Sequence, residues 1–197
     1  MRFVILSIAS LSALTLLTAG ADKQFRAGTA ESYSHQTANQ ITVGAKSFDK
    51  PELTEDAFGK KVDPLKYGVL PVLVVIENKS RNALDLQYLE VNLVASDGRH
   101  AGAVPPQDLF NVGRRTKRPG INPIPVPIPT SRKKNPLEAP EIATRAFIAK
   151  MLPPGDSVSG FFYFEAKPEA GDKIYLNGIR DARSGQEMLY FEFPLEQ

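Results

Sequence analysis

Leu70 to Ser80 reads Leu-Pro-Val-Leu-Val-Val-Ile-Glu-Asn-Lys-Ser and is the longest β-branched run after the N-terminal leader. Such a run is typical of a strand. Its apolar residues alternate between two sets, one made of Val72, Val74 and Ile76 and the other of Leu73 and Val75. Because successive side chains of a strand point to opposite faces, both faces are apolar and both need cover. The stretch therefore predicts the central strand of a packed sheet.

Further strands are predicted on both sides of this stretch. Ile41 to Phe48 alternates weakly, and the aromatic run Gly160 to Glu165 places Phe162 and Phe164 on one face. Asp97-Gly98 is a hairpin signal, since Asp-Gly supplies the positive φ angles that a tight two-residue turn requires. Lys173 to Leu176 and Met188 to Phe193 predict a terminal hairpin. We expect an all-β fold, an antiparallel β-sandwich of about seven strands.

One short α-helix is expected within this β fold. Pro140 suits the first turn of a helix, Glu141 suits its positive end, and Pro153-Pro154 stops it. The predicted helix therefore runs from Pro140 to Leu152, with Ala143, Ala146, Phe147 and Met151 on one face. Residues 49–64 carry acids and Pro51, which predicts a loop with at most one helical turn.

The first 21 residues predict export. Arg2 is followed by an apolar segment of about 15 residues and by small residues at 19–21, the pattern of a cleaved signal peptide. Ala21 stands where a lipoprotein would carry its lipidated cysteine, and the chain has no cysteine. Residues 22–40 are polar and predict a flexible tether, and residues 41–197 predict a single domain. We expect a periplasmic or extracellular protein with no transmembrane segment after cleavage.

A proline-rich basic insertion at 113–136 interrupts this domain. Between Asp108 and Glu138 the chain has no acidic residue. Four prolines alternate with aliphatic residues over 123–129, which favours an extended chain. Basic residues stand on both sides of the prolines: Arg114, Arg115, Lys117, Arg118, Arg132, Lys133 and Lys134. Residues 22–197 have a net charge of +1, so these seven leave −6 on the remainder.

Two interpretations of the seven basic residues stay open. They predict a site for a polyanion, namely anionic lipid or a polysaccharide. Alternatively, they form a solvated loop whose charges keep it off the core. Aromatic residues do not alternate with the basic ones, so no nucleic acid is expected as a partner.

The sequence predicts no catalytic residue, cofactor or metal site. Both histidines, His35 and His100, lack an acid, cysteine or second histidine at triad or ligand spacing. The acids of residues 49–64 do not follow the calcium-loop spacing. The catalytic motifs for nucleophiles, zinc and phosphate are absent from the sequence. An enzyme is therefore not expected, and a carboxylate-dependent hydrolase is the enzymatic alternative.

Three features resemble immunoglobulin-like domains of unknown function in bacterial secreted proteins and lipoproteins. They are a strand that ends in Asn78-Lys79-Ser80, the Asp97-Gly98 hairpin, and Pro153-Pro154-Gly155 ahead of the aromatic strand. The likeness covers about residues 40–195. It implies a sandwich fold and supplies no catalytic residue. The basic insertion and Ala21 depart from the pattern.

These observations predict an exported, non-catalytic β-sandwich that acts as an interaction or envelope-associated module. Its expected partner is an envelope protein or a polyanion.

Overall fold

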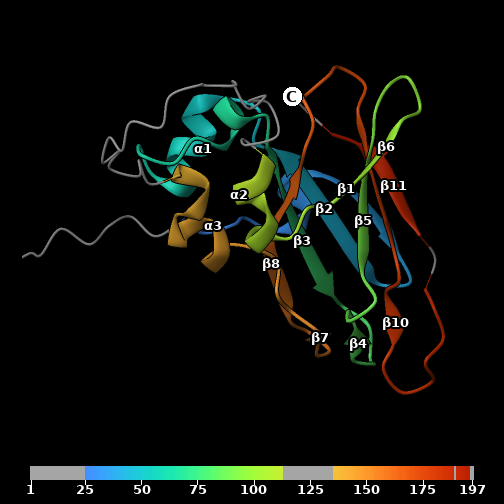
Figure 1. The fold of residues 1–197 in the computed structure, drawn as a ribbon. Helices are drawn as coiled ribbons and strands as arrows, with labels where there is room; N and C mark the ends of the chain where they lie inside the picture. Colours follow the sequence, from blue (N-terminus) through green and yellow to red (C-terminus); the bar gives the residue numbers. More distant parts are fainter. Residues whose placement is uncertain (1–24, 113–134, 189, 196–197) are drawn as a thin grey trace, which may run out of the picture.

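The protein is described by a computed structural model covering residues 25–112, 135–188 and 190–195 (Figure 1). The predicted signal peptide and the seven basic residues of the insertion lie outside these ranges. Among the described residues, no helix combines the length and hydropathy needed to cross a membrane.

The central sheet has four antiparallel strands in the order β1-β2-β3-β8. Its strands are β1 (Ser34–Ala38), β2 (Ile41–Ser47), β3 (Leu70–Asn78) and β8 (Ser157–Phe164). β3 pairs with β2 along one edge and with β8 along the other. Pro71 lies opposite Tyr163 and its carbonyl accepts from Phe48 N, 2.9 Å away. The predicted central strand is confirmed.

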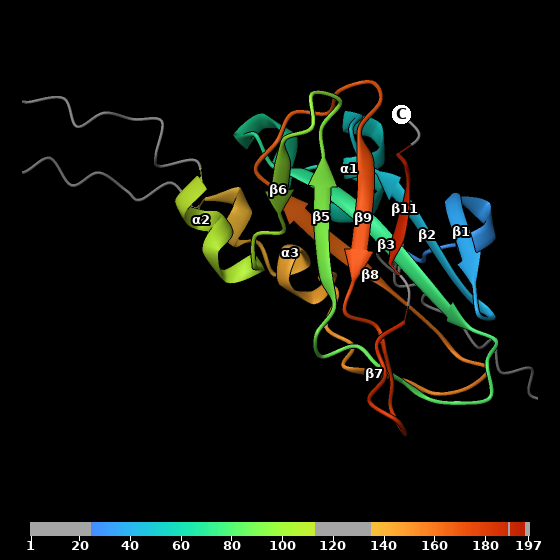
Figure 2. The same ribbon diagram turned by 90° about the vertical axis from the view of Figure 1, so that its right-hand side faces the viewer.

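A second antiparallel sheet lies across one face of the first, in the order β11-β9-β5-β6 (Figures 1 and 2). It contains β5 (Glu90–Val94), β6 (His100–Gly102), β9 (Lys173–Asn177) and β11 (Phe191–Pro194). A small third sheet of two-residue strands joins β4 (Leu84–Asp85), β7 (Met151–Leu152) and β10 (Arg180–Asp181). The predicted all-β sandwich is confirmed.

The main core fills the space between the two large sheets. Val72, Val74 and Ile76 of β3 pack there with Phe164 of β8. The second sheet contributes Val91, Leu93, Ile174, Leu176, Phe191 and Phe193. This is the even-numbered face of β3 that the sequence predicted, and its residues are almost completely buried.

A second core covers the opposite face of β3. Leu73 and Val75 pack there with Phe161 and Tyr163 of β8. The cover consists of α1 (Pro51–Phe58), α2 (Leu109–Val112) and α3 (Pro140–Thr144), with the 3-10 turns η1 (Ala30–Ser32), η2 (Pro64–Tyr67), η3 (Pro106–Asp108) and η4 (Pro136–Glu138). Figure 1 shows these helices on the side away from the second sheet. β8 lies beside β3 in the same sheet, so it covers neither face of β3.

Hydrogen bonds join the edges of the two large sheets. On one side the Gln36 side chain in β1 accepts from Glu192 N in β11 at 2.9 Å. On the other side Val104 N, just after β6, donates to Tyr163 O in β8 at 2.7 Å. The sandwich is thus fastened along both of its open sides.

The predicted tether at residues 22–40 is wrong for its C-terminal half, because η1 and β1 are part of the fold. Ala30 is fully buried, and its N–H donates to Glu77 Oε1 at 2.8 Å. Gly44 makes room for it, since a Cβ at that position would lie 2.2 Å from Ala30 O. The polar composition that suggested a tether belongs instead to an edge strand exposed along one side.

The predicted helix from Pro140 to Leu152 is too long. α3 ends at Thr144 because the following residues pair with β8: Phe161 N donates to Arg145 O at 2.8 Å, and Phe147 N donates to Phe161 O at 3.0 Å. Ala146 is buried, whereas Met151 is 57% exposed in β7, so the two do not share a packed face. Pairing with a sheet edge has overridden local helix propensity.

Two smaller expectations also need correction. Residues 49–64 contain α1, an eight-residue helix, rather than at most one turn. In the confirmed hairpin between β5 and β6 the loop has three residues, since Ala95 N bonds to Arg99 O at 2.8 Å, and Gly98 has the positive φ of 82°. The Asp97 side chain lies in this loop, and its Oδ1 accepts a hydrogen bond from Arg99 N.

Asn78 fastens the end of β3 to two neighbouring segments. Its side chain is fully buried, and Nδ2 donates to the carbonyls of Asn82, Leu152 and Pro153 at 2.8, 3.2 and 3.1 Å. Oδ1 accepts from the backbone N–H and the hydroxyl of Ser80, which forms a turn directly after the strand.

We expect Asn78→Ala to lower the free energy of unfolding by about 3 kcal/mol, since three carbonyls lose their donor in a buried place. Urea unfolding of the purified domain measures this. Asn92→Ala, on the solvent face of β5, is the matched control, with an expected loss below about 1 kcal/mol. Equal losses for the two variants would contradict this role of Asn78.

Asp181 holds the turn after β10. Its Oδ1 accepts from Arg183 N at 3.0 Å and from Ser184 N at 2.8 Å, and Oδ2 accepts from Asn82 Nδ2 at 2.6 Å. The backbone donor of Ser184, followed by the Asn82 amide, lowers the pKa of this carboxyl below its usual value.

A lowered pKa means that the ionised carboxylate stabilises the fold above the unfolded-state pKa of about 3.9, and that this contribution is lost as the pH falls through the folded-state value. Wild type should therefore exceed Asp181→Asn in unfolding free energy at neutral pH, and the gap should shrink below about pH 4. Chemical denaturation across pH 7 to 3 tests this, with Asp156→Asn as the exposed control. A gap that stays constant would contradict it.

Candidate interaction groove

A groove of about 650 Å³ lies on the helical side of the molecule. Its floor is the aromatic strand β8, through Phe161, Phe162 and Tyr163. One wall is the segment from Val104 to Phe110, and the other runs from Leu137 through α3 to Ile148. Most of the lining is apolar.

Tyr163 ties the floor of the groove to its wall. Its hydroxyl donates to Ile142 O in α3 at 2.7 Å, and the side chain is 1% exposed. Burial raises the pKa of the Tyr163 phenol well above its usual value. The phenol therefore stays protonated and acts as a permanent donor.

The wall that runs from Leu137 to Ile148 depends on the close approach of Phe147 to Gly160. A Cβ at this position would lie 2.4 Å from Phe147 Cα, so only glycine lets the 145–147 segment pair with β8. The Phe147 ring then stacks on Phe162 with ring centroids 5.1 Å apart. Ile148 is left 78% exposed at the rim. An apolar side chain so exposed beside an apolar groove is typical of an interaction surface.

The basic insertion enters and leaves at this groove. Asn135, the first described residue at the C-terminal end of the insertion, donates from Nδ2 to Phe110 O at 3.3 Å and caps η4 by accepting from Leu137 N at 3.0 Å. α2 and η4 therefore lie side by side and bring the two ends of the insertion together. The predicted polyanion-binding residues themselves, Arg114, Arg115, Lys117, Arg118, Arg132, Lys133 and Lys134, lie outside the described residues.

The groove does not assemble a catalytic constellation from the described residues. Glu138 is the one carboxylate side chain in its lining. His35 is exposed on β1 with Nδ1 2.9 Å from Tyr33 O, and His100 is exposed on β6. Within residues 25–112, 135–188 and 190–195, no three His, Cys, Asp or Glu side chains are placed to hold a metal ion.

Sequence reasoning missed the groove, because its walls come from segments about 40 residues apart in the chain. Pro105-Pro106 and Ile148 were the available signals, and neither has a periodicity that predicts a groove.

Comparisons with known proteins give a distant structural likeness. No family profile matches the sequence, and no curated protein matches it. Among solved structures, the ycdA protein of Bacillus subtilis, assigned to the lipoproteins, shows 12% identity and a TM-score of 0.39 over 82% of this chain. The chain spans 38% of the length of that protein. The secreted protein MPT63 of Mycobacterium tuberculosis shows 16% identity and a TM-score of 0.36 over 84% of this chain and 95% of its own. At TM-scores this low the likenesses carry no argument about function.

Tyr163→Phe removes the donor to a buried carbonyl without changing the packing of the ring. We expect it to lower the unfolding free energy by about 1–2 kcal/mol and to speed amide exchange in α3. Denaturant titration and hydrogen exchange measure the two effects. The exposed Tyr67→Phe is the control and should change neither. Unchanged exchange in residues 140–146 of Tyr163→Phe would contradict the tie between floor and wall.

Proposed function

We propose that this chain is an exported, non-catalytic β-sandwich of immunoglobulin-like type, an interaction module that captures a polyanion through the basic insertion. The signal-peptide pattern of residues 1–21 supports export. The strand pattern and the two packed sheets support the immunoglobulin-like assignment.

The separation of charge is the observation that carries the proposal. Seven cations without an acid between them occupy one insertion, while the rest of residues 22–197 has a net charge of −6. Such a distribution orients a molecule in the field of an anionic surface and concentrates attraction in one segment. Hydrogen bonds of Asn135 to Phe110 O and from Leu137 N fix the C-terminal base of that segment beside an apolar groove.

The enzymatic alternative, a carboxylate-dependent hydrolase, has less support. A hydrolase that works through carboxylates alone needs two carboxylates facing one substrate, one as general acid and the other as base or nucleophile. The groove lining includes one carboxylate, that of Glu138. The acids of residues 49–64 that belong to helix α1, namely Glu52, Glu55 and Asp56, are exposed on the surface.

Retention on heparin tests the proposal. The mature chain should elute at a salt concentration well above physiological, and replacing all seven basic residues by Gln should weaken binding at least a hundredfold, since each Lys or Arg contributes about 1 kcal/mol near an anionic surface. Affinity should fall steeply with added salt.

The control removes the same number of exposed cations elsewhere: Lys50, Lys60, Lys61, Lys66, Arg81, Lys150 and Arg183. This variant should keep most of its retention. Equal weakening in both variants would show that net charge alone is responsible, and unchanged retention of the insertion variant would overturn the proposal.

A further inference from the structure

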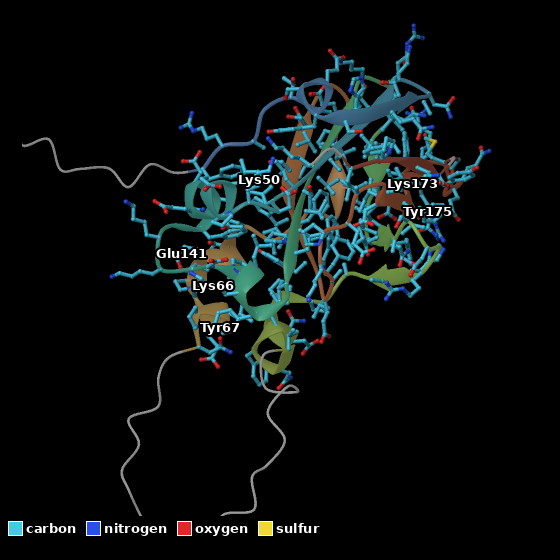
Figure 3. All side chains as sticks on the ribbon, turned by 90° about the horizontal axis from the view of Figure 1, so that it is seen from above. Lys50, Lys66, Tyr67, Glu141, Lys173 and Tyr175 are labelled. Atoms are coloured by element: carbon cyan, nitrogen blue, oxygen red, sulfur yellow. The ribbon has the colours of Figure 1, made fainter. Side chains whose placement is uncertain are left out.

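The outer face of the second sheet is uncovered. Figure 2 shows β5, β9 and β11 facing the viewer with no described element over them, and Figure 3 places Lys173 and Tyr175 on the opposite side of the molecule from Tyr67 and Glu141. This face is therefore remote from the helical side where the groove lies. The side chains of β9 alternate, so that Tyr175 and Asn177 face outward while Ile174 and Leu176 enter the core.

Three tyrosines are gathered on or beside this face. The rings of Tyr175 and Tyr190 stack with centroids 5.5 Å apart, and Tyr190 is 56% exposed. Tyr88, in the connection between β4 and β5, is 54% exposed. Exposed aromatic rings combine a flat apolar surface with a polar tip and are favoured at binding surfaces.

A hollow of about 380 Å³ lies at the Tyr88 end of this face. Its lining is mainly polar: Gln87, Tyr88, Leu89, Glu90, Asn177, Gly178, Arg180 and Glu187. The guanidinium of Arg180 lies over the Tyr88 ring, 4.1 Å from its centroid. Gly178 leaves room for the Tyr88 backbone, because a Cβ there would lie 1.8 Å from Tyr88 O, and Glu187 Oε1 accepts from Gly178 N at 3.3 Å.

Two of the residues that line this hollow each have a polar atom without a hydrogen-bond partner among the described residues. Asn177 Oδ1 is an acceptor, Arg180 Nε is a donor, and both atoms are buried. Burial without a partner costs free energy, so such atoms in a folded protein call for an explanation. A hydroxyl group can serve both the acceptor and the donor, because it donates one hydrogen bond and accepts others.

Charge on this face argues against an anionic ligand. Glu90 and Glu187 line the hollow together with Arg180, so an anion there would meet two carboxylates. Further along the face Lys173 is already paired with Glu192 at 3.0 Å. The ligand that fits is neutral, rich in hydroxyl groups and flat enough to lie on tyrosine rings.

We propose that this face binds a neutral glycan chain, with Tyr88 as the central contact and with Tyr175 and Tyr190 extending the platform. The apolar C–H face of a sugar ring packs on the aromatic rings. Its hydroxyls take the hydrogen bonds of Asn177 and Arg180 once the exposed Tyr88 ring, which covers the guanidinium, moves onto the sugar. The residues of this site differ from the seven basic residues of the polyanion proposal.

The test uses the mature full-length chain and four neutral oligosaccharides: cellohexaose, maltohexaose, xylohexaose and chitohexaose. Three of the six tyrosines, Tyr88, Tyr175 and Tyr190, belong to this face and the chain has no tryptophan, so half of the tyrosine fluorophores report on the site. We expect saturable binding to at least one sugar with a Kd of about 1 mM or tighter. Tyr88→Ala and Asn177→Ala should each weaken it at least about tenfold.

Tyr67→Ala, on the helical side, is the matched control and should bind as wild type, as should the variant with seven Gln in the insertion. Circular dichroism and thermal unfolding confirm that each variant is folded. Absence of binding to all four sugars, or an unchanged Kd in both Tyr88→Ala and Asn177→Ala, would overturn the glycan site. Heparin retention that persists in those cases would leave the polyanion proposal standing.

Discussion

Burial of β3 on both faces is the constraint on which the rest of the structure depends. A strand with apolar residues on two sides cannot lie at the surface, so the chain must supply two different covers. The second sheet closes the face of Val72, Val74 and Ile76, and the helices close the face of Leu73 and Val75. The two covers leave the molecule with two unlike outer sides, one helical and grooved, the other a bare polar sheet.

Short polar connections fix these layers in place. α3 has only five residues and is held by the backbone pairing of 145–147 with β8 and by the Tyr163 hydroxyl. The sheets are joined at their edges through Gln36 on one side and Val104 on the other. None of these contacts is large in area. Each joins segments far apart in the sequence, and together they set the positions of the groove and of the tyrosine face.

The sequence predicts the strands well where side-chain periodicity is strong. β3, β8 and the β5–β6 hairpin follow from alternation and turn residues, and even the division of Phe161 and Tyr163 from Phe162 and Phe164 is correct. The sequence-based prediction fails where a tertiary contact determines the secondary structure. β1 carries no apolar alternation because it is an exposed edge, and residues 145–147 leave the helix because β8 offers backbone partners. The groove and the Tyr88 hollow are made by segments distant in sequence, which no local pattern reports.

The burial of Asn78 has a consequence for how the protein is produced. Asn78-Lys79-Ser80 is an acceptor sequence for N-linked glycosylation. In the folded chain its amide nitrogen is fully buried and donates three hydrogen bonds, so no transferase reaches it. In a eukaryotic secretory host the unfolded chain would meet the transferase first. A sugar attached there would replace one of the two N–H donors of this amide and obstruct closure of the core, which makes a bacterial host the safer source of native protein.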